Sequence, residues 1–485
     1  MVSSTGRRWA LGVSSWNWLC LAYVGTISAA LISYGATGAF ALSAITVMMA
    51  VLAGAAVVVR PLPLGSVKTV VLVTFGFVAL EAWIYIQSLP FPAGMSAAWT
   101  SLLPLGLAGA RSISIQSSDT VYSMQTVALP FLAFILGGLL PRNNREAAIL
   151  MRAIGVIGGL IVLVSLAQFA MTNDFILSRP KLSYRDSFTA FFVNRNSAGT
   201  FIGLSLLVVL RLFWSTSRSL TMHQLLAFSL LGRAAPGRRP TSPIFYAGLF
   251  GVLLVGLFMT KSRGAIFATS LSGTVFAYYL LWLRLRSSAP RKAIAPFATA
   301  AVGLAVAIVV LFAVLGDRVV LRAETMGSND PRFCVMPGIT RLLLENWQIG
   351  TGAGTFEEAF GAYRDPMCGL SGVWEKAHNS YLQAMIELGV GGSAVILVCV
   401  FAVLATFAVR IFSLSSSTKR SYAGLGLAAL TLVLTHSLVD FSLEIPGVAM
   451  YVAAIVGCAL TASSPDGGIG LARVHHSAHR IRRDA

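Results

Sequence analysis

Hydrophobic stretches recur along nearly the whole chain of 485 residues, and each is about 20 residues long, enough to cross a bilayer as a helix. Charged residues make up only 11% of the sequence, against about 25% in a soluble domain. The sequence therefore predicts an all-α, polytopic integral membrane protein. Its twelve predicted spans lie near residues 16–35, 38–59, 69–89, 121–140, 149–170, 197–214, 244–260, 265–282, 293–315, 384–409, 421–439 and 447–462.

Lysine and arginine are distributed unevenly between the segments that connect these spans. With the N-terminus in the cytoplasm, the cytoplasmic segments hold 23 Lys and Arg and three acids, whereas the outer segments hold 13 Lys and Arg and 14 acids. This asymmetry is the positive-inside bias of membrane proteins, so both termini are predicted to be cytoplasmic. The same bias explains the formal net charge of +18, and no nucleic-acid partner is expected. The first span, which follows Arg7 and Arg8, is predicted to be a retained signal anchor.

The predicted organisation has four parts. Residues 1–315 hold spans one to nine, residues 316–380 form a long outer loop with short helices, residues 381–462 hold spans ten to twelve, and residues 463–485 form a basic cytoplasmic tail. In the loop, the apolar pattern of residues 340–347 predicts a short interfacial helix. The glycines of residues 350–354 are expected to end it.

Cysteine usage agrees with this orientation. Cys334 and Cys368 both lie in the long loop, which faces an oxidising compartment in the predicted topology. The sequence leaves open whether these two form a disulfide or remain free. No Walker loop, GxGxxG, HExxH or CxxC motif is present, so nucleotide hydrolysis and a protein zinc site have no support.

One motif stands at the return of the long loop to the membrane. His378 and Asn379 are followed, nine residues later, by a glycine-rich run that begins at Gly389 and ends at Gly392. A helix N-terminus disfavours a charged imidazole, which keeps His378 neutral and available as a base near pH 7. The alternative is a histidine hydrogen-bonded within its own loop. The glycine run favours a functional role, because it permits close backbone approach.

Cations on the predicted outer face form a second group. They cluster before span six, at the tip between spans seven and eight, and in the long loop, at Arg179, Lys181, Arg185, Arg195, Lys261, Arg263 and Arg341. A guanidinium group binds phosphate through two hydrogen bonds. The alternative is pairing with acids such as Asp186 or Glu345. Arg263 has no acid nearby in the sequence, which favours ligand binding.

Buried ionisable groups form a third set. His436 and Asp440 are predicted to lie one helical turn apart at the outer end of span eleven, and Glu81 lies within span three. Ionisable groups at membrane depth are costly to bury, which favours a functional role for them. Mutual pairing that stabilises the bundle is the alternative.

Four stretches of the chain together resemble the O-antigen ligase and polymerase family of bacterial inner-membrane proteins. They are FVNRNSAG (192–199), KSRGA (261–265), the region from RLLLENWQIGTGAGTF to HNSYLQAMIELGVGG (341–392), and HSLVDFSLEIPG (436–447). The His-Asn, nine residues, Gly-x-x-Gly spacing is the most specific of these features. The resemblance covers roughly the last 300 residues.

The resemblance implies a metal-independent glycosyltransferase without a cofactor. Such enzymes take a glycan from undecaprenyl pyrophosphate on the periplasmic face of the inner membrane. Carried over by motif, the catalytic residues are His378 and Arg263, and an upstream essential arginine is Arg195 or Arg185. Arg341, Asn379 and Asp440 complete the predicted substrate-binding residues. The chain departs from the family pattern in the charged pair Glu375-Lys376 before the histidine.

The predicted activity is that of an O-antigen ligase, whose partners are a lipid-linked glycan donor, a lipid A–core acceptor and membrane lipids. A repeat-unit polymerase, whose acceptor is another glycan, is the alternative. A lipid-linked glycan transporter is less favoured, because a transporter is expected to hold charges near the midplane and to show paired repeat halves.

Overall fold

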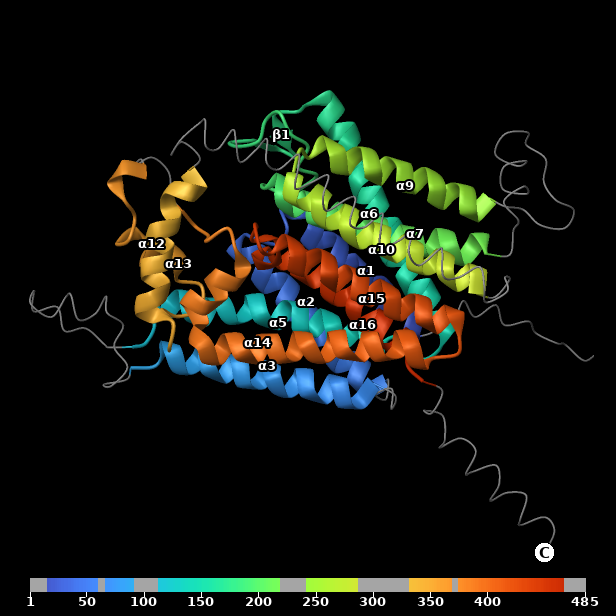
Figure 1. Cartoon of the computed structure of the whole chain (residues 1–485), viewed down its shortest axis with the longest axis horizontal. Helices are drawn as coiled ribbons and strands as arrows, with labels where there is room; N and C mark the ends of the chain where they lie inside the picture. Colours follow the sequence, from blue (N-terminus) through green and yellow to red (C-terminus); the bar gives the residue numbers. More distant parts are fainter. Residues whose placement is uncertain are drawn as a thin grey trace, which may run out of the picture.

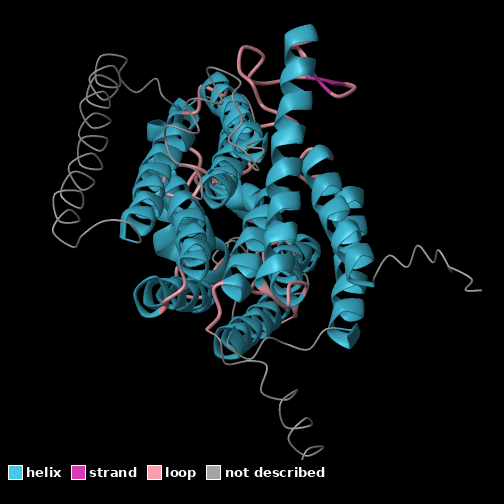
Figure 2. Cartoon of the chain, turned by 90° about the vertical axis from the view of Figure 1, so that its right-hand side faces the viewer, coloured by secondary structure: helices cyan, strands magenta, loops and turns pink. Residues whose placement is uncertain are grey.

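The computed structural model describes residues 15–59, 66–90, 112–218, 241–286, 331–368 and 374–465. These residues form long helices, a few short ones and a single small hairpin (Figure 2). The long helices are α1 (Ser15–Ile32), α2 (Ala39–Val59), α3 (Val67–Ser88), α5 (Ser117–Leu139), α6 (Asn144–Met171), α7 (Arg195–Ser217), α9 (Thr241–Met259), α10 (Arg263–Arg286), α14 (Ser380–Ser413), α15 (Ser417–His436) and α16 (Pro446–Ala462). The short elements are β1 (Phe175–Ile176), β2 (Arg179–Pro180), α12 (Pro331–Asn346), α13 (Phe356–Gly361), η5 (Pro366–Cys368) and η6 (Ser442–Glu444).

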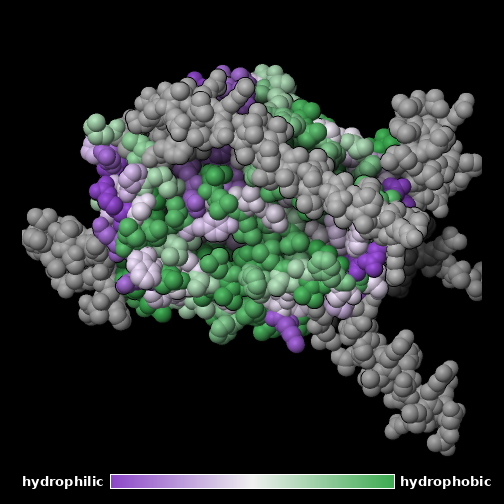
Figure 3. Space-filling model, in the orientation of Figure 1, coloured by the Kyte–Doolittle hydropathy of each residue, from purple (hydrophilic) through white to green (hydrophobic). Residues whose placement is uncertain are grey.

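The predicted fold class is confirmed: the chain is an all-α, polytopic membrane protein. Among the described residues, seven helices are long and apolar enough to cross a membrane, and α1, α9 and α16 are shorter apolar helices. Eleven of the twelve predicted spans coincide with helices. The ninth, 293–315, and most of the predicted basic tail lie outside the described residues. Figure 3 shows hydrophobic side chains over the middle of one face, with hydrophilic ones mainly toward its two ends.

The long helices run side by side as a bundle (Figure 1). Helix α7 forms its centre, because 89% of its most apolar 18-residue stretch is buried. The buried share of the corresponding stretch is 17% for α3 and for α14, which lie at the periphery. Glycines bring α16 and α5 together, because a Cβ on Gly457 would lie 2.1 Å from the carbonyl oxygen of Phe134. Small residues are what allow such close helix packing in a membrane, where apolar burial between helices has little driving force.

The short helices gather at one end of the bundle. Helices α12 and α13 lie at the left of Figure 1 and run across the bundle rather than along it. We call this end, which carries residues 174–195, 260–263, 331–368, 374–379 and 437–445, the loop end. Helix α12 begins nine residues before the predicted start at residue 340. Val335 and Ile339 are buried in one cluster with Leu342, at helical spacing, and extend the apolar face that the sequence indicated only from residue 340 onward.

Candidate active site

The loop end is attached to α14 where that helix is interrupted. Gly389 has φ +67° and ψ −175°, which are not helical values, so the carbonyl groups just before it are free to accept other hydrogen bonds. The Ile386 oxygen accepts from the Thr351 N–H at 2.8 Å, and the Glu387 oxygen accepts from the Gly352 N–H at 3.0 Å. The loop between α12 and α13 is therefore bonded directly to the backbone of α14.

Glycine is required on both sides of this junction. A Cβ on Gly389 would lie 2.6 Å from the carbonyl oxygen of Gln348, and a Cβ on Gly350 would lie 2.2 Å from that of Glu387. Gly350, Gly352 and Gly354 all have positive φ values, which L side chains rarely adopt. The close backbone approach predicted for the Gly389 run is confirmed, and the partner is the glycine loop that ends α12.

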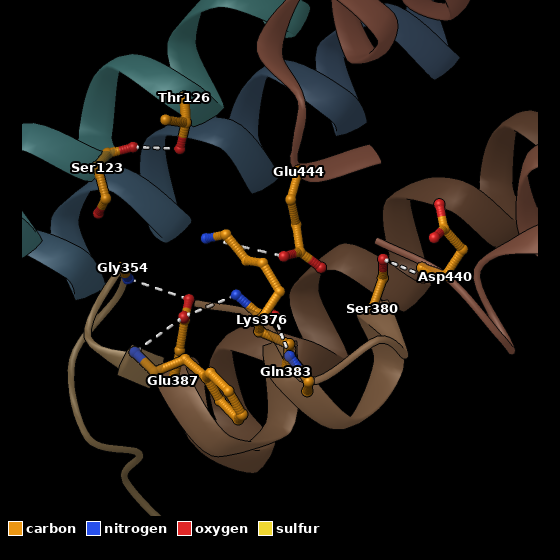
Figure 4. A network of polar contacts seen from close by, with 11 residues as sticks. Ser123, Thr126, Gly354, Lys376, Ser380, Gln383, Glu387, Asp440 and Glu444 are labelled. Atoms are coloured by element: carbon orange, nitrogen blue, oxygen red, sulfur yellow. Dashed lines mark hydrogen bonds and ion pairs between the residues drawn. The ribbon is translucent and has the colours of Figure 1, made fainter. Parts of the chain in front are cut away.

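The Glu387 carboxylate adds side-chain bonds to the same junction. It accepts from the Gly354 N–H at 3.0 Å and the Phe356 N–H at 3.3 Å. Gln383, one turn earlier on α14, donates to the same carboxylate at 3.0 Å, and its own amide oxygen accepts from the Ala377 N–H at 3.0 Å. Figure 4 shows these contacts around Glu387 and Gln383. The loop between α12 and α13 and the backbone at Ala377 are thus fixed relative to α14.

His378 follows Ala377 directly and precedes α14. Asn379 is the N-cap of α14, and its side-chain oxygen accepts from the backbone N–H groups of Tyr381 and Leu382. His378 itself has φ +54°, an uncommon value that marks a constrained residue. Its ring stands edge-on between Trp374, 5.4 Å away between ring centroids, and Phe441, 4.9 Å away. The imidazole is therefore held in place from both sides.

A cavity of about 550 Å³ lies at the loop end, and His378 is in its wall. Its lining comes from four parts of the chain that are far apart in sequence. These are the turn between α1 and α2, the segment that leads into α7, the segment before α14, and the segment around η6. The polar and charged lining residues are Tyr34, Thr37, Ser183, Tyr184, Asn194, Ser197, Glu375, Lys376 and His378. Phe192, Trp374, Phe441 and Ile445 contribute apolar surface. The mixed lining suits an amphipathic ligand such as a sugar ring.

Asp440 joins α7, the turn before α10 and the segment after α15. The Asp440 carboxylate, which is fully buried, accepts from the Asn196 amide at 2.8 Å and from the Ser442 hydroxyl. Asn196 in turn accepts from the Ser262 hydroxyl at 2.7 Å. Both carboxylate oxygens of Asp440 therefore accept hydrogen bonds from protein groups. The Asn379 side chain is also fully engaged, because its oxygen caps α14 and its amide N–H donates to the Leu438 oxygen at 2.9 Å.

The predicted arrangement of His436 and Asp440 on one helix is wrong. Helix α15 ends at His436, and Asp440 lies beyond it in a turn. The Ser437 N–H bonds the Val433 oxygen and the Val439 N–H bonds the His436 oxygen, which closes the helix. His436 Nδ1 is 2.7 Å from the Thr200 hydroxyl. Both side chains therefore contact α7, one turn apart, at Asn196 and Thr200.

The predicted arginines lie at the loop end, and none of them lines the cavity. Two of them lie against rings of its lining. The Arg179 guanidinium is 4.8 Å from the ring centroid of Tyr34, and that of Arg195, the first residue of α7, is 5.1 Å from the ring centroid of Tyr184. Arg185 is exposed and donates from Nε to the Lys181 oxygen at 3.0 Å. Arg341 is exposed on α12, and Arg263 is exposed at the first position of α10. The Arg263 guanidinium has no hydrogen bond or ion pair with any described residue.

The two acids considered as partners for these arginines bind other groups. Asp186 pairs with Lys261 at 3.0 Å, and the hydrogen bond from Lys261 holds the pKa of Asp186 below its usual value. Glu345 accepts from the Tyr363 hydroxyl. Neither acid therefore neutralises Arg195 or Arg263 among the described contacts.

Two side chains that are not among the predicted site residues face each other beside the cavity. Lys376 Nζ lies 3.9 Å from Glu444 Oε2. Burial raises the pKa of Glu444 to about 8, against the opposing effect of Lys376. Lys376 belongs to the pair Glu375-Lys376, whose charge was unexpected in the sequence. Tyr34 and Thr37 also line the cavity, but the sequence did not indicate them. No motif in the first 60 residues distinguishes them from residues at the ends of other helices.

The cysteines of the helices differ from Cys334 in the long loop. Cys20, Cys399 and Cys458 lie in helices and form no disulfide, whereas Cys334 in the long loop is disulfide-bonded. The side chain of Cys368 lies outside the described residues.

Residues 247–397 match a family model described as O-antigen ligase. The match confirms the predicted resemblance, and it supports a membrane enzyme of the O-antigen ligase or polymerase type. It spans less than half of the chain and contains Arg263, Arg341, His378, Asn379 and the whole glycine junction. No curated protein matches the chain.

Proposed function

We propose that this O-antigen ligase-like chain transfers a glycan from undecaprenyl pyrophosphate to a lipid A–core acceptor. The observation that carries the proposal is His378, which lies inside the matched region and in the wall of a cavity at one end of a membrane-embedded bundle. A reaction between two lipid-anchored substrates needs such a site, because the lipids stay in the bilayer while the sugars react outside it.

In the proposed reaction, His378 acts as the general base. The acceptor hydroxyl oxygen forms a bond to the anomeric carbon, its proton passes to the imidazole, and the bond from that carbon to the pyrophosphate oxygen breaks. The electron pair leaves on the phosphate oxygen. A positioned base contributes about 10² to 10⁴ in rate. The rings of Trp374 and Phe441 on either side hold the imidazole in one orientation for this step.

The leaving pyrophosphate needs positive charge, which fixed cations supply without a metal ion. Arg263 is our primary candidate, with Arg195 assisting and Arg185 and Arg341 nearby on the same end. Arg195 is favoured over Arg185, because its guanidinium lies against Tyr184 of the cavity wall. Asn379 and Asp440 would act by positioning, since their polar atoms hold the start of α14 and of α7.

We further propose that the chain lies in the inner membrane with its loop end in the periplasm and both termini in the cytoplasm. At the opposite end of the described bundle, cations outnumber acids. The cations there include Arg142, Arg145, Arg218, Arg284, Arg286, Lys419 and Arg420, and Glu146 is an acid at the same end. Such an excess of cations is typical of the cytoplasmic side.

Glycan profiles of a strain that lacks this chain distinguish the ligase from the polymerase. Loss of a ligase is expected to leave long glycans on the lipid carrier and none on lipid A–core. Loss of a polymerase would instead leave single repeat units on the carrier or the acceptor, which would assign the alternative function. Unchanged glycans in the deletion strain would contradict both.

A further inference from the structure

The cavity wall contains one cation among its described lining residues, and it is Lys376. The arginines that the sequence predicted all lie outside that lining. Lys376 is two residues before His378 and is bordered on the cavity by Glu375. A positive charge in the wall that holds the base is well placed for an anion bound in the cavity, because a partly enclosed site strengthens electrostatic interactions.

Lys376 is not locked by its protein partner. Its Nζ lies 3.9 Å from the Glu444 carboxylate, beyond hydrogen-bond distance, whereas charge-assisted bonds are typically about 2.7–2.9 Å. Lys261 and Asp186 at the same end are 3.0 Å apart and hydrogen-bonded. The Lys376 side chain keeps 30% of its surface exposed and that of Glu444 keeps 19%, so the amine retains donors for a ligand.

We propose that Lys376 binds the diphosphate of the lipid-linked donor, and that Glu444 competes with the diphosphate for the Lys376 amine. This inference rests on the proposed function. The diphosphate would then bind against the part of the cavity wall that also carries His378. This places the leaving group and the base beside the same sugar.

The charges around Glu444 determine when it competes. Lys376 faces it from the segment before α14, Glu387 and the Ser380 hydroxyl face it from α14, and Asp440 faces it from the segment before η6. Figure 4 shows Lys376 next to Glu444, with Glu387 nearby. Burial keeps the pKa of Glu444 near 8, so its carboxyl is mostly neutral at neutral pH and leaves Lys376 to the ligand. Above this pKa the carboxylate forms and attracts the amine.

The test is binding of undecaprenyl pyrophosphate to the purified full-length protein in phosphatidylcholine nanodiscs. Lys376→Met should weaken binding about tenfold or more, as expected for loss of a hydrogen bond to a charged group, and Lys376→Arg should retain most of it. Lys68→Met is the control, because Lys68 is exposed at the start of α3 and lies outside the cavity lining, and it should bind like the wild type. Thermal unfolding of each variant checks that the fold is intact.

The pH dependence provides a second readout. Wild-type binding should fall between about pH 7 and pH 9, as Glu444 loses its proton. Glu444→Gln, which cannot ionise, should bind equally at both values. A fall of the same size in Glu444→Gln would contradict the competition.

Two comparisons separate this inference from the function on which it rests. If Lys376→Met binds the donor like the wild type while Arg263→Ala binds it weakly, the proposed function stands and Lys376 has no part in it. If the wild type itself does not bind the lipid, the proposed function is wrong. Adding phosphatidylglycerol to the nanodiscs should leave the Lys376→Met defect unchanged. Its disappearance would mean that the lysine binds any lipid phosphate, and it would overturn the assignment to the donor.

Discussion

His378→Ala is expected to lower glycan transfer by about 10² to 10⁴ while the protein still inserts and folds, because a positioned general base accounts for a factor of that size. Its imidazole lies in the cavity wall, between Trp374 and Phe441. The measurement is the amount of glycan-modified lipid A–core in a deletion strain that expresses the variant at the wild-type level.

His378→Gln separates the role of the base from that of the side-chain volume. Glutamine fills most of the same space and forms hydrogen bonds, but it cannot accept a proton near neutral pH. It should therefore fail as His378→Ala does. Leu344→Ala, an exposed position on α12 outside the cavity lining, is the control and should transfer normally. Full activity of His378→Gln would remove the base from the mechanism.

Gly389→Ala is expected to disrupt the loop end and abolish transfer as a consequence. The added Cβ would lie 2.6 Å from the Gln348 carbonyl oxygen, and the backbone angles of Gly389 (φ +67°, ψ −175°) belong to a region that is essentially restricted to glycine and costs an L residue roughly 1–3 kcal/mol. Relieving the contact would separate the glycine loop from α14 and release the segment that carries His378. The measurement is the thermal unfolding temperature in detergent, which should fall by several degrees, together with transfer activity.

Gly391→Ala is the matched control for this variant. It lies two residues further along α14, and a Cβ there would meet nothing within 4 Å. Alanine also favours a helix over glycine by about 1 kcal/mol, so Gly391→Ala should be as stable as the wild type or more so. Equal stability of the two variants would show that the close approach at Gly389 does not hold the loop end.

Much of the fold follows from hydropathy. Long apolar runs specify membrane helices almost regardless of their neighbours, because a backbone in lipid must satisfy its hydrogen bonds within the segment. The start of α14 was also predictable, since Asn379 is a strong N-cap. The end of α15 was not: His436 and Asp440 are four residues apart, which suits one helix face, but the turn at Ser437 separates them and sends both to α7.

The candidate site was predictable only in part, because it is assembled from segments far apart in the sequence. His378 carried a local signal in its spacing from Gly389, and this residue does line the cavity. Tyr34 and Thr37 carried none, since their contribution depends on how the turn between α1 and α2 packs against residues 183–197. Lys376 was visible as an unexpected charge, but its relation to Glu444 arises only when η6 folds back beside α14.

Glycan transfer by the purified chain tests the proposed function most directly. Nanodiscs that contain the protein and a lipid A–core acceptor would be supplied with a glycan on undecaprenyl pyrophosphate, and the products separated by size. The wild type is expected to yield glycan-linked lipid A–core and free undecaprenyl pyrophosphate in equal amounts, and His378→Ala to yield neither. Wild-type protein that binds both lipids but forms no linked product, or that joins donor glycans to each other instead, would contradict the assignment as a ligase.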